Sequence, residues 1–235
     1  MSVNNTSLIL ENKNLSTFEI TENFTCIRFL NQNKERFELE FNLEKGTSFN
    51  TFLIISGDEL FIIHPPEKEY SKLINEVISN FFLQFKFKRI NIITGHVNPK
   101  IIETIKSISL KFSNLAITCS NPGSKLISEL WNQKNPKLET FIEQELPKIN
   151  IVKKELNLEL ENISLKLLPV ATARWPGGLI VYEENQEILL SEKIFSAHLV
   201  SEEWSETNRI STETDRKHFY DCLMAPMSNQ IVSIV

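Results

Sequence analysis

The first part of the chain has the alternation of hydrophobic and polar positions that is typical of β-strands. Its apolar positions hold many β-branched and aromatic residues, which favour extended structure. Short clusters of polar residues and glycine separate these stretches and indicate turns. The pattern predicts strands within residues 15–65, at 24–30, 36–43, 51–57 and 59–66.

The middle of the chain changes to the spacing of amphipathic helices. In residues 67–83 the apolar positions recur every three or four residues and share one helical face. These positions are Tyr70, Leu73, Ile74, Val77, Ile78 and Phe81. The short apolar strands that follow are predicted at 87–94 and 114–120. Two further helices are predicted at 98–112 and 121–132, with Asn98 and Asn121 as N-caps and a proline in the first turn of each.

Strand patterns return between 138 and 200. The segments 157–170 and 178–195 both alternate, and the second is a hairpin that turns at 183–187. Residues 213–235 then have helical spacing, interrupted at Pro226.

This order of elements predicts two packed sheets with helices outside them, an α+β fold. No repeat, linker or low-complexity tract divides the sequence, so residues 1–235 are expected to form one domain. Residues 1–19 are expected to be a loosely ordered lead into it.

Composition narrows the classes of function. The chain has 235 residues and a net charge of −5, and its basic residues are spread along the sequence, which excludes a stripe for nucleic acid or an anionic membrane surface. No apolar run reaches the roughly 18 residues of a membrane span. The N-terminus lacks the basic and apolar regions of a secretory signal, so a cytoplasmic location is expected.

Cysteine usage excludes a disulfide framework. Cys26, Cys119 and Cys222 are odd in number and far apart, and they form no C-x-x-C pair. Three reduced thiols, mostly buried, are expected.

Four segments together resemble the flavodiiron proteins, whose N-terminal half has the metallo-β-lactamase fold. They are residues 46–54, 117–127, 174–198 and 215–227, which resemble the family's Gly-Thr-Thr-Tyr-Asn strand, Cys-Ser-Asn-Pro-Gly turn, Trp-Pro hairpin with Phe-Gly-Ala-His, and Tyr-Phe-Asp-Cys-Leu helix. Their order and spacing agree over residues 20–235. Arg before Trp-Pro and Lys before the Phe segment resemble the cyanobacterial diflavin members. The resemblance implies a metallo-β-lactamase-like αββα four-layer sandwich of two mixed β-sheets flanked by helices.

The resemblance also implies a degenerate metal site. The family's ligand loop, His-x-Glu-x-Asp-His, offers imidazoles and carboxylates to two irons about 3.5 Å apart. The family's next histidine and its bridging aspartate follow later in the chain, and its last histidine lies beyond Val235. The matching positions of this sequence are His96, Asn98, Lys100, Ile101, Arg174 and Lys193.

Only His96 of that set is a ligand type, so no metal is expected. If Lys100, Arg174 and Lys193 converge, they would place positive charge where metal ions would lie, at a cost of several kcal/mol per pair. Asp215 and Asp221 are the candidates to balance that charge.

The other histidines favour structural roles. His64 follows a strand and is expected in a partly buried turn, His198 matches a family histidine that is not an iron ligand, and His218 is expected on the solvent face of the last helix. A zinc site of His64, His96 and His198 is the alternative, since zinc takes three or four protein ligands. Their spacing neither supports nor excludes it.

Trp175 is the candidate cofactor contact. In the family this Trp-Pro turn lies near the FMN supplied by the second subunit of a head-to-tail dimer, which implies a contact between Trp175 and a partner's FMN. The alternative is that Trp175 caps the core. The segment 120–125 lacks the spacing of a phosphate-binding loop and fits the start of a helix.

The 235 residues contain no segment that resembles the family's flavodoxin-like or flavin-reductase domains. We therefore expect no cofactor bound by this chain alone, and a homodimer or a heterodimer with a full-length diflavin flavodiiron protein.

Three hypotheses for function follow from the resemblance. The first is a non-catalytic or accessory subunit of an oxygen-reducing electron-transfer system. The second is an oxidoreductase that reduces oxygen with flavin domains on a separate chain, and the third is a truncated gene remnant without activity. Hydrolysis is disfavoured because it needs the same metal loop.

Overall fold

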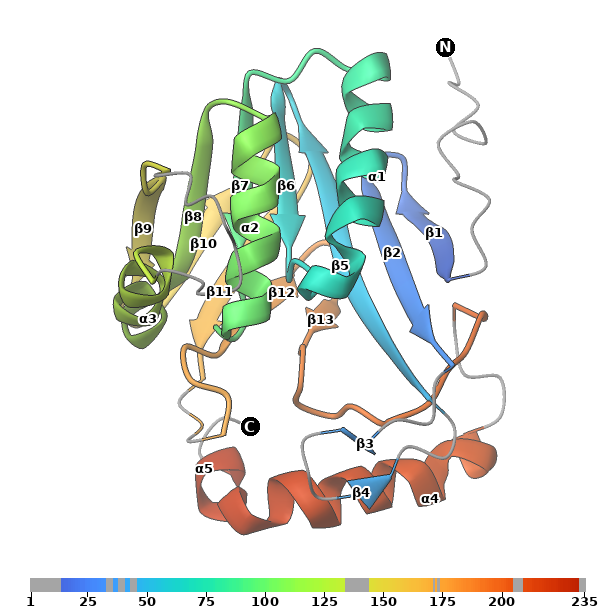
Figure 1. Ribbon diagram of the computed structural model, residues 1–235. Coiled ribbons are helices and arrows are strands. Elements are labelled where there is room, and N and C mark those ends of the chain that lie inside the picture. The colour runs from blue at the N-terminus through green and yellow to red at the C-terminus, as the bar shows by residue number, and fades with distance from the viewer. Residues whose placement is uncertain are drawn as a thin grey trace.

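The computed structural model describes residues 14–32, 36–37, 41–42, 46–133, 144–170, 172, 174–204 and 209–232. Two packed sheets form its centre, with three helices on the outer face of the larger one (Figure 1). The larger sheet has the order β1-β2-β5-β6-β7-β8-β9. Its strands are β1 (Leu15–Thr21), β2 (Phe24–Asn31), β5 (Thr47–Ser56), β6 (Glu59–Ile63), β7 (Arg89–Ile93), β8 (Leu115–Ser120) and β9 (Lys148–Val152). β1, β2, β5 and β6 pair antiparallel, whereas β6 to β9 are parallel.

The parallel strands are joined by helices, as parallel pairing requires. These helices are α1 (Ser71–Gln84), which follows a short 3-10 turn η2 (Lys68–Tyr70), α2 (Pro99–Lys111) and α3 (Asn121–Trp131). The side chain of Asn98 accepts a hydrogen bond from the Ile101 amide, which confirms it as the N-cap of α2. The predicted cap of α3 was one residue late, because Ser120 caps that helix through the Gly123 amide and Asn121 is its first residue.

The smaller sheet is a meander of four strands, β10 (Leu156–Glu159), β11 (Ser164–Pro169), β12 (Leu179–Glu183) and β13 (Ile188–Leu190). All three of its pairings are antiparallel, so the larger sheet is mixed as expected and the smaller one is not. A two-stranded ladder of β3 (Arg36–Phe37) and β4 (Phe41–Asn42) lies apart from both sheets.

Two apolar layers hold these elements together. Alternate residues of β6 illustrate them, since Ile62 packs toward the helices while Phe61 and Ile63 pack toward the smaller sheet. Side chains such as Leu167 and Val181 complete the layer between the sheets. Each fully buried aliphatic side chain contributes about 1.5–3 kcal/mol.

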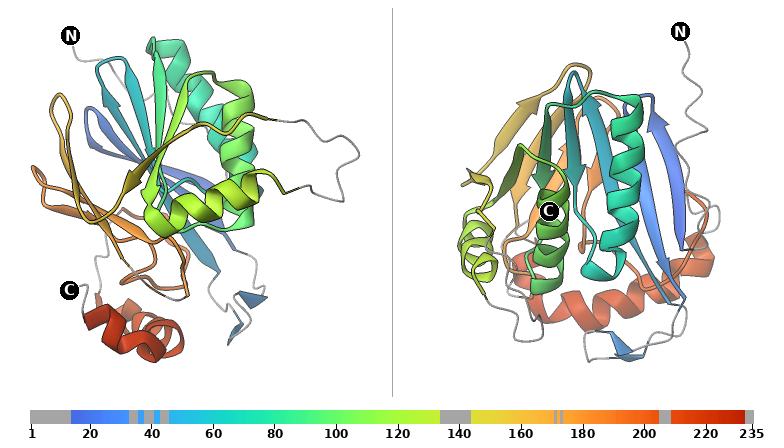
Figure 2. Two further views of the ribbon diagram at one scale, coloured as in Figure 1. Left: turned by 90° about the vertical axis from the view of Figure 1, so that its left-hand side faces the viewer. Right: turned by 45° about the horizontal axis from the view of Figure 1, so that its top comes forward.

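The C-terminal part is one helical run that lies across the ends of both sheets (Figure 2). It consists of α4 (Arg209–Phe219), a π-helical turn η3 (Tyr220–Met224), a 3-10 turn η4 (Ala225–Met227) and α5 (Ser228–Val232). The change of helix type around Pro226 confirms the predicted interruption, because proline cannot donate the backbone hydrogen bond of a regular helix.

The N-terminal segment and the three thiols differ in how well the sequence predicted them. The expected N-terminal lead of residues 1–19 was too long, because Leu15 to Glu19 pair with β2, while residues 1–13 lie outside the described part. The three cysteines are free, and burial raises the pKa of Cys26 and of Cys119 to about 12, which keeps both thiols protonated. Among the described residues, no helix is both long and apolar enough to cross a bilayer.

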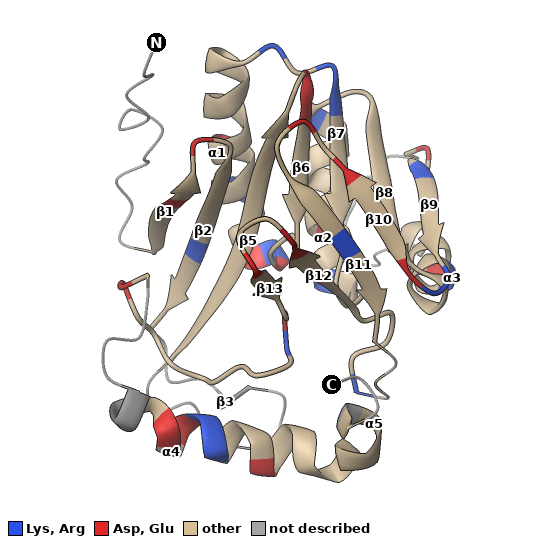
Figure 3. Cartoon of the chain, turned by 180° about the vertical axis from the view of Figure 1, so that it is seen from behind, with Lys and Arg blue, Asp and Glu red and all other residues tan. Residues whose placement is uncertain are grey.

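Charge is mixed on the face seen in Figure 3. In the view from behind, acidic and basic residues are interspersed on the strands of both sheets and on α4 (Figure 3). That face has no stripe of one sign, in agreement with the dispersed basic residues of the sequence.

Candidate functional site

The site lies where β6 and β7 end and where the chain leaves β13. His64 follows β6, the turn between β7 and α2 holds Gly95 and His96, and Glu192 follows β13. Carboxyl ends of adjacent parallel strands commonly position functional groups. His64 is 2 % exposed and His96 5 % exposed, so both imidazoles lie inside the molecule.

His96 and Glu192 form a buried pair through Nδ1 of the imidazole and Oε1 of the carboxylate. Burial would raise the pKa of Glu192, but the facing His96 and the nearby Lys193 outweigh it and lower that pKa to about 2. Glu192 is therefore ionised at neutral pH and accepts a hydrogen bond from the ring.

Asn98 occupies the other nitrogen of His96. Its Nδ2 lies 3.1 Å from His96 Nε2 and 3.1 Å from Oε1 of Glu67, while its Oδ1 accepts from the Ile101 amide at 2.9 Å. One amide group thus connects the imidazole, a carboxylate and the start of α2.

Lys100 lies between two carboxylates and not against another cation. Its Nζ is 3.1 Å from Oε2 of Glu67 and 2.8 Å from Oε1 of Glu69. Burial would lower the pKa of Lys100, but the hydrogen bonds with Glu69 and Glu67 raise it, so the ammonium stays charged.

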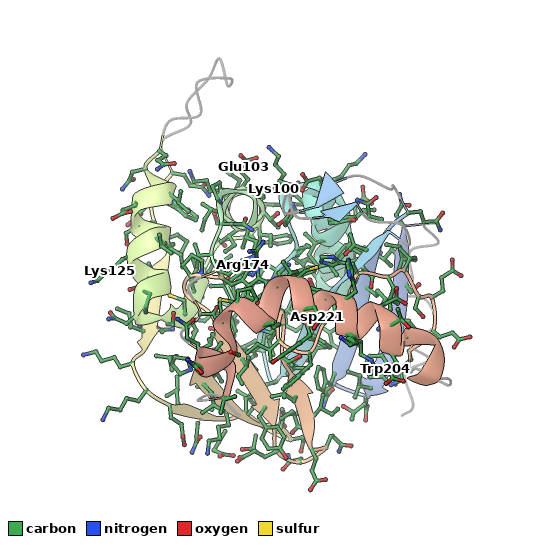
Figure 4. All side chains as sticks on the ribbon, turned by 90° about the horizontal axis from the view of Figure 1, so that it is seen from below. Lys100, Glu103, Lys125, Arg174, Trp204 and Asp221 are labelled. Atoms are coloured by element: carbon green, nitrogen blue, oxygen red, sulfur yellow. The ribbon has the colours of Figure 1, made fainter. Side chains whose placement is uncertain are left out.

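The three expected cations do not form one unbalanced cluster. Lys193 lies beside Glu192, with Nζ 6.0 Å from the centre of the Phe49 ring. The guanidinium of Arg174 is 5.9 Å from the centre of the Trp175 ring. Seen from below, Arg174 lies by the C-terminal helical run and Lys100 on α2 (Figure 4).

Glutamates balance the charges of Lys100 and Lys193. Glu67, Glu69 and Glu192 face Lys100 and Lys193, as described above. Asp221, in contrast, pairs with Lys217 one helical turn away at 2.8 Å, on the C-terminal run. Asp215 lies on α4, in the same C-terminal run.

Backbone conformation at the site is unusual. Three residues other than glycine have positive φ there, namely His64 at 55°, Glu192 at 56° and Phe195 at 63°. Such conformations cost roughly 1 kcal/mol or more each and persist where the surroundings impose them. They turn the side chains of His64 and Glu192 toward the same small space next to Gly95.

A cavity of about 460 Å³ opens beside the pair. His64 and Glu192 line it, together with Lys100 and Lys193. Its apolar lining includes Phe195, Trp204 and Leu189, whose side chains remain 63 %, 45 % and 43 % exposed. It falls within the range of volumes that hold small ligands.

A diiron centre does not fit these residues. Both nitrogens of His96 are engaged, and Lys100 places an ammonium at the expected loop. Ile101 is 2 % exposed and packs in the layer beneath the helices, where it offers no ligand atom. Within the described parts of the chain, no group of three or more His, Cys, Asp or Glu side chains is arranged to hold a metal ion.

The remaining histidines are placed as follows. Nε2 of His64 donates to the Leu179 carbonyl at 3.2 Å, and burial lowers the pKa of this imidazole. His64 was expected to be partly buried at a turn and is instead fully enclosed. Burial, helped by Lys193 and His218, lowers the pKa of His198 to about 4, and its ring meets Phe219 edge-on at 4.9 Å. His218 is exposed on α4, as expected.

Trp175 lies in a small apolar cluster under the C-terminal run. It is 5 % exposed, and its ring is stacked with that of Phe219 at 6.5 Å between centroids and 4° between planes. Leu223 and Met224 complete the cluster. This placement favours the interpretation that Trp175 caps the core over a direct contact with a flavin.

Sequence reasoning missed the two glutamates that organise the site. The resemblance assigned the bridging carboxylate to Lys193, whereas the carboxylate that faces His96 is that of the preceding residue, Glu192. Glu67 was read only as the start of a helix. The available signal was that Glu192 carries a carboxylate directly before Lys193, the position assigned to the bridging ligand. An irregular loop can shift such a match between two sequences by one residue.

Comparison with known proteins places these observations in a family. The model of the family described as "ODP family beta lactamase" matches residues 47–234 of this chain. "Putative diflavin flavoprotein A 6" of Nostoc sp. is 30 % identical over 221 residues, covering 93 % of this chain and 36 % of that protein. "Putative diflavin flavoprotein A 3" of Synechocystis sp. is 27 % identical, with 95 % and 36 % covered. The chain thus spans about a third of the length of these relatives.

Solved structures agree with the same architecture. A flavodiiron core of Flv1 from Synechocystis superposes with a TM-score of 0.79 at 25 % identity, covering 94 % of this chain and 52 % of that one. The 1–254 fragment of putative diflavin flavoprotein A 5 from Nostoc has a TM-score of 0.78 at 28 % identity, covering 94 % and 82 %. These similarities confirm the metallo-β-lactamase-like sandwich expected from the sequence.

Proposed function

This chain belongs to the ODP family of beta-lactamase-like domains, and we propose that it is a degenerate flavodiiron-type domain that acts as a non-catalytic or accessory subunit. The system it would serve is an oxygen-reducing electron-transfer system, as the resemblance to diflavin flavoproteins implies. The observation that supports the proposal is the pairing at the metal-loop positions. His96 is hydrogen-bonded to Asn98 and Glu192, and Lys100 pairs with Glu67, so the imidazole nitrogens that could hold iron are used within the protein.

The proposed partner is a second copy of this chain or a full-length diflavin flavodiiron protein. FMN would reach the complex only through the partner. The exposed apolar side chains of Phe195, Trp204 and Leu189 at the cavity form a surface that such a partner could cover. We propose neither nucleic acid nor membrane insertion as part of this function.

The test mixes the purified chain with a full-length diflavin flavodiiron protein from the same genome. Light scattering after size exclusion would report complex formation, and an oxygen electrode would report NAD(P)H-dependent oxygen uptake. We expect the chain alone to take up no oxygen, and the mixture to form a complex with an altered rate. Oxygen uptake by this chain with only a separate flavin reductase and FMN would instead favour the split oxidoreductase.

A matched pair of variants locates the surface. Phe195→Asn replaces an exposed ring with a residue that accepts a positive φ, so its backbone cost is small. Leu83→Asn changes an apolar side chain on α1 that is even more exposed, at 84 %, and does not line the cavity. The proposal expects the first variant to weaken the complex and the second to leave it unchanged.

A further inference from the structure

The amide of Asn98 can adopt only one orientation. Its Oδ1 accepts from the Ile101 amide at 2.9 Å, which is the N-cap bond of α2. Its Nδ2 lies 3.1 Å from a carboxylate oxygen of Glu67. An ionised carboxylate has no proton and can only accept a hydrogen bond. Exchanging oxygen and nitrogen would break both contacts, so two independent neighbours fix the same orientation.

This orientation determines the proton positions on His96. Asn98 presents an N–H group to Nε2 at 3.1 Å, so Nε2 must accept and carries no proton. Nδ1 then carries the ring proton and donates it to Glu192. A partner on one ring nitrogen sets the state of the other in this way in many protein sites.

We propose that Asn98 locks His96 in the Nδ1–H tautomer and thereby closes a hydrogen-bonded chain, Glu192–His96–Asn98–Glu67–Lys100, that joins the two sheets. We call this chain the Asn98 clamp. It rests on the proposed function in one respect, namely that no metal binds Nε2 of His96. The hydrogen bonds of the clamp connect these segments at the positions where metal–ligand bonds would otherwise connect them.

The Asn98 clamp joins three segments that are distant in sequence. Glu67 lies between β6 and α1, His96 and Asn98 lie between β7 and α2, and Glu192 follows β13 of the smaller sheet. His96 and Glu192 are buried, Asn98 and Glu67 are partly buried, and Lys100 at the end of the clamp is about half exposed. Such a paired polar chain positions its segments, and removing a partner of the buried His96–Glu192 pair leaves a buried polar group unpaired.

The first test reads the tautomer directly. Long-range ¹⁵N–¹H correlation spectra of the uniformly labelled chain at pH 7 distinguish protonated from unprotonated imidazole nitrogens, and a His96→Gln variant assigns the signals. We expect Nδ1 of His96 to be protonated and Nε2 to be unprotonated. A protonated Nε2 in the wild-type chain would overturn the lock.

The second test removes the donor and keeps the helix cap. In Asn98→Asp the side chain still caps α2, because aspartate is as good an N-cap as asparagine. It can no longer donate to His96, and its charge faces Glu67. We expect Nε2 of His96 to acquire a proton and Tm to fall by about 3–10 °C.

The control adds the same charge elsewhere. Asn157 is exposed on β10, and Asn157→Asp should change Tm by less than about 2 °C. If Asn98→Asp does not fold, Asn98→Ser keeps a cap but replaces the two amide N–H donors with one hydroxyl on a shorter side chain, and the His96 tautomer should no longer be fixed. Unchanged His96 signals in both Asn98 variants would overturn the proposal.

Adding Fe(II) separates this inference from the proposed function. Unchanged His96 signals with an unprotonated Nε2 support both. A protonated Nε2 with no response to Fe(II) overturns the clamp and leaves the accessory role standing. Loss of the Nε2 signal at stoichiometric Fe(II) would show metal binding and overturn both.

Discussion

A methyl group on Gly95 would lie 2.9 Å from Cγ of Glu192, so the bare Cα of this glycine forms one wall around the buried carboxylate. The same methyl would lie 3.0 Å from Cδ2 of His64. Gly95 does not have a positive φ, so its role is to leave space and not to supply an unusual backbone. The packing of Glu192 against Gly95 is therefore testable by adding one carbon atom.

Gly95→Ala should destabilise the chain by roughly 1–3 kcal/mol, because the added methyl displaces side chains that are held by other bonds. Chemical denaturation would measure the change in unfolding free energy. A double-mutant cycle with Glu192→Ala gives the cause, because two of the three close atoms belong to Glu192. An equal cost of Gly95→Ala in both backgrounds would show that His64 alone limits the space.

Stability should fall as the pH drops below neutrality. His198 has a folded-state pKa of about 4, against about 6.5 in an unfolded chain. Between these values the unfolded state binds a proton that the folded state does not, so stability is lost as the pH falls from 6.5 toward 4. Burial lowers the pKa of His64 too and adds to the loss in the same direction.

Urea midpoints measured from pH 7.5 to 4 would test this dependence. His198→Gln keeps a polar side chain without a titrating ring, so its midpoint should vary less with pH over that window. A steeper fall in the variant would contradict the assignment. Below pH 4.5 a further loss should begin in both proteins as Glu192, whose folded-state pKa is about 2, starts to bind protons preferentially in the unfolded state.

Local signals in the sequence gave most of the fold, and contacts between distant segments gave the site. Asn98 was identified as a cap because capping depends on neighbours three residues away. The cap of α3 was displaced because Asn121 before Pro122 is also a common start, and only Ser120 is turned toward the Gly123 amide. β9 was not predicted as a separate strand, since its apolar run is short.

The pairing of His96 with Glu192 spans 96 residues of sequence, and no periodicity encodes it. The positive φ of Glu192 could not be predicted from the sequence either, because glycine is the residue that normally indicates such a conformation. The resemblance placed the carboxylate after β13 to within one residue. The direction in which each side chain points is determined by the packing of the two sheets and could not be read from the sequence.

Trp175 should contribute strongly to stability and little to cofactor binding. Trp175→Ala empties a buried site against Phe219, Leu223 and Met224 and should cost about 3–5 kcal/mol. Trp204→Ala is the comparison, because Trp204 is 45 % exposed and should cost clearly less. Limited proteolysis should cut the C-terminal run faster in the first variant, and equal denaturation midpoints would contradict the placement of Trp175.

The isolated chain should not bind FMN, because the indole of Trp175 is buried and stacked against Phe219. Titration of FMN with the chain should leave flavin fluorescence unquenched up to tens of micromolar protein. Micromolar quenching would contradict this, and a variant of the cavity residue Phe195 would then show whether the flavin enters there.

Rebuilding the metal loop should not by itself restore two irons. Asn98→Glu, Lys100→Asp and Ile101→His recreate the residue types of the family's loop, but Ile101 is 2 % exposed in the layer under the helices, so an imidazole there starts among apolar side chains. Adding Arg174→His and Lys193→Asp removes two positive charges and adds a second carboxylate beside Glu192.

Iron per chain would be measured by mass spectrometry after anaerobic expression with added iron. We expect none in the wild-type chain, little in the triple variant, and more in the five-substitution variant. The triple variant with Lys193→Asp alone is the discriminating comparison, because Lys193 lies beside Glu192 whereas Arg174 lies over Trp175. Lys193→Asp should therefore account for most of the gain, and a gain that depends on Arg174→His instead would show that residue 174 reaches the site.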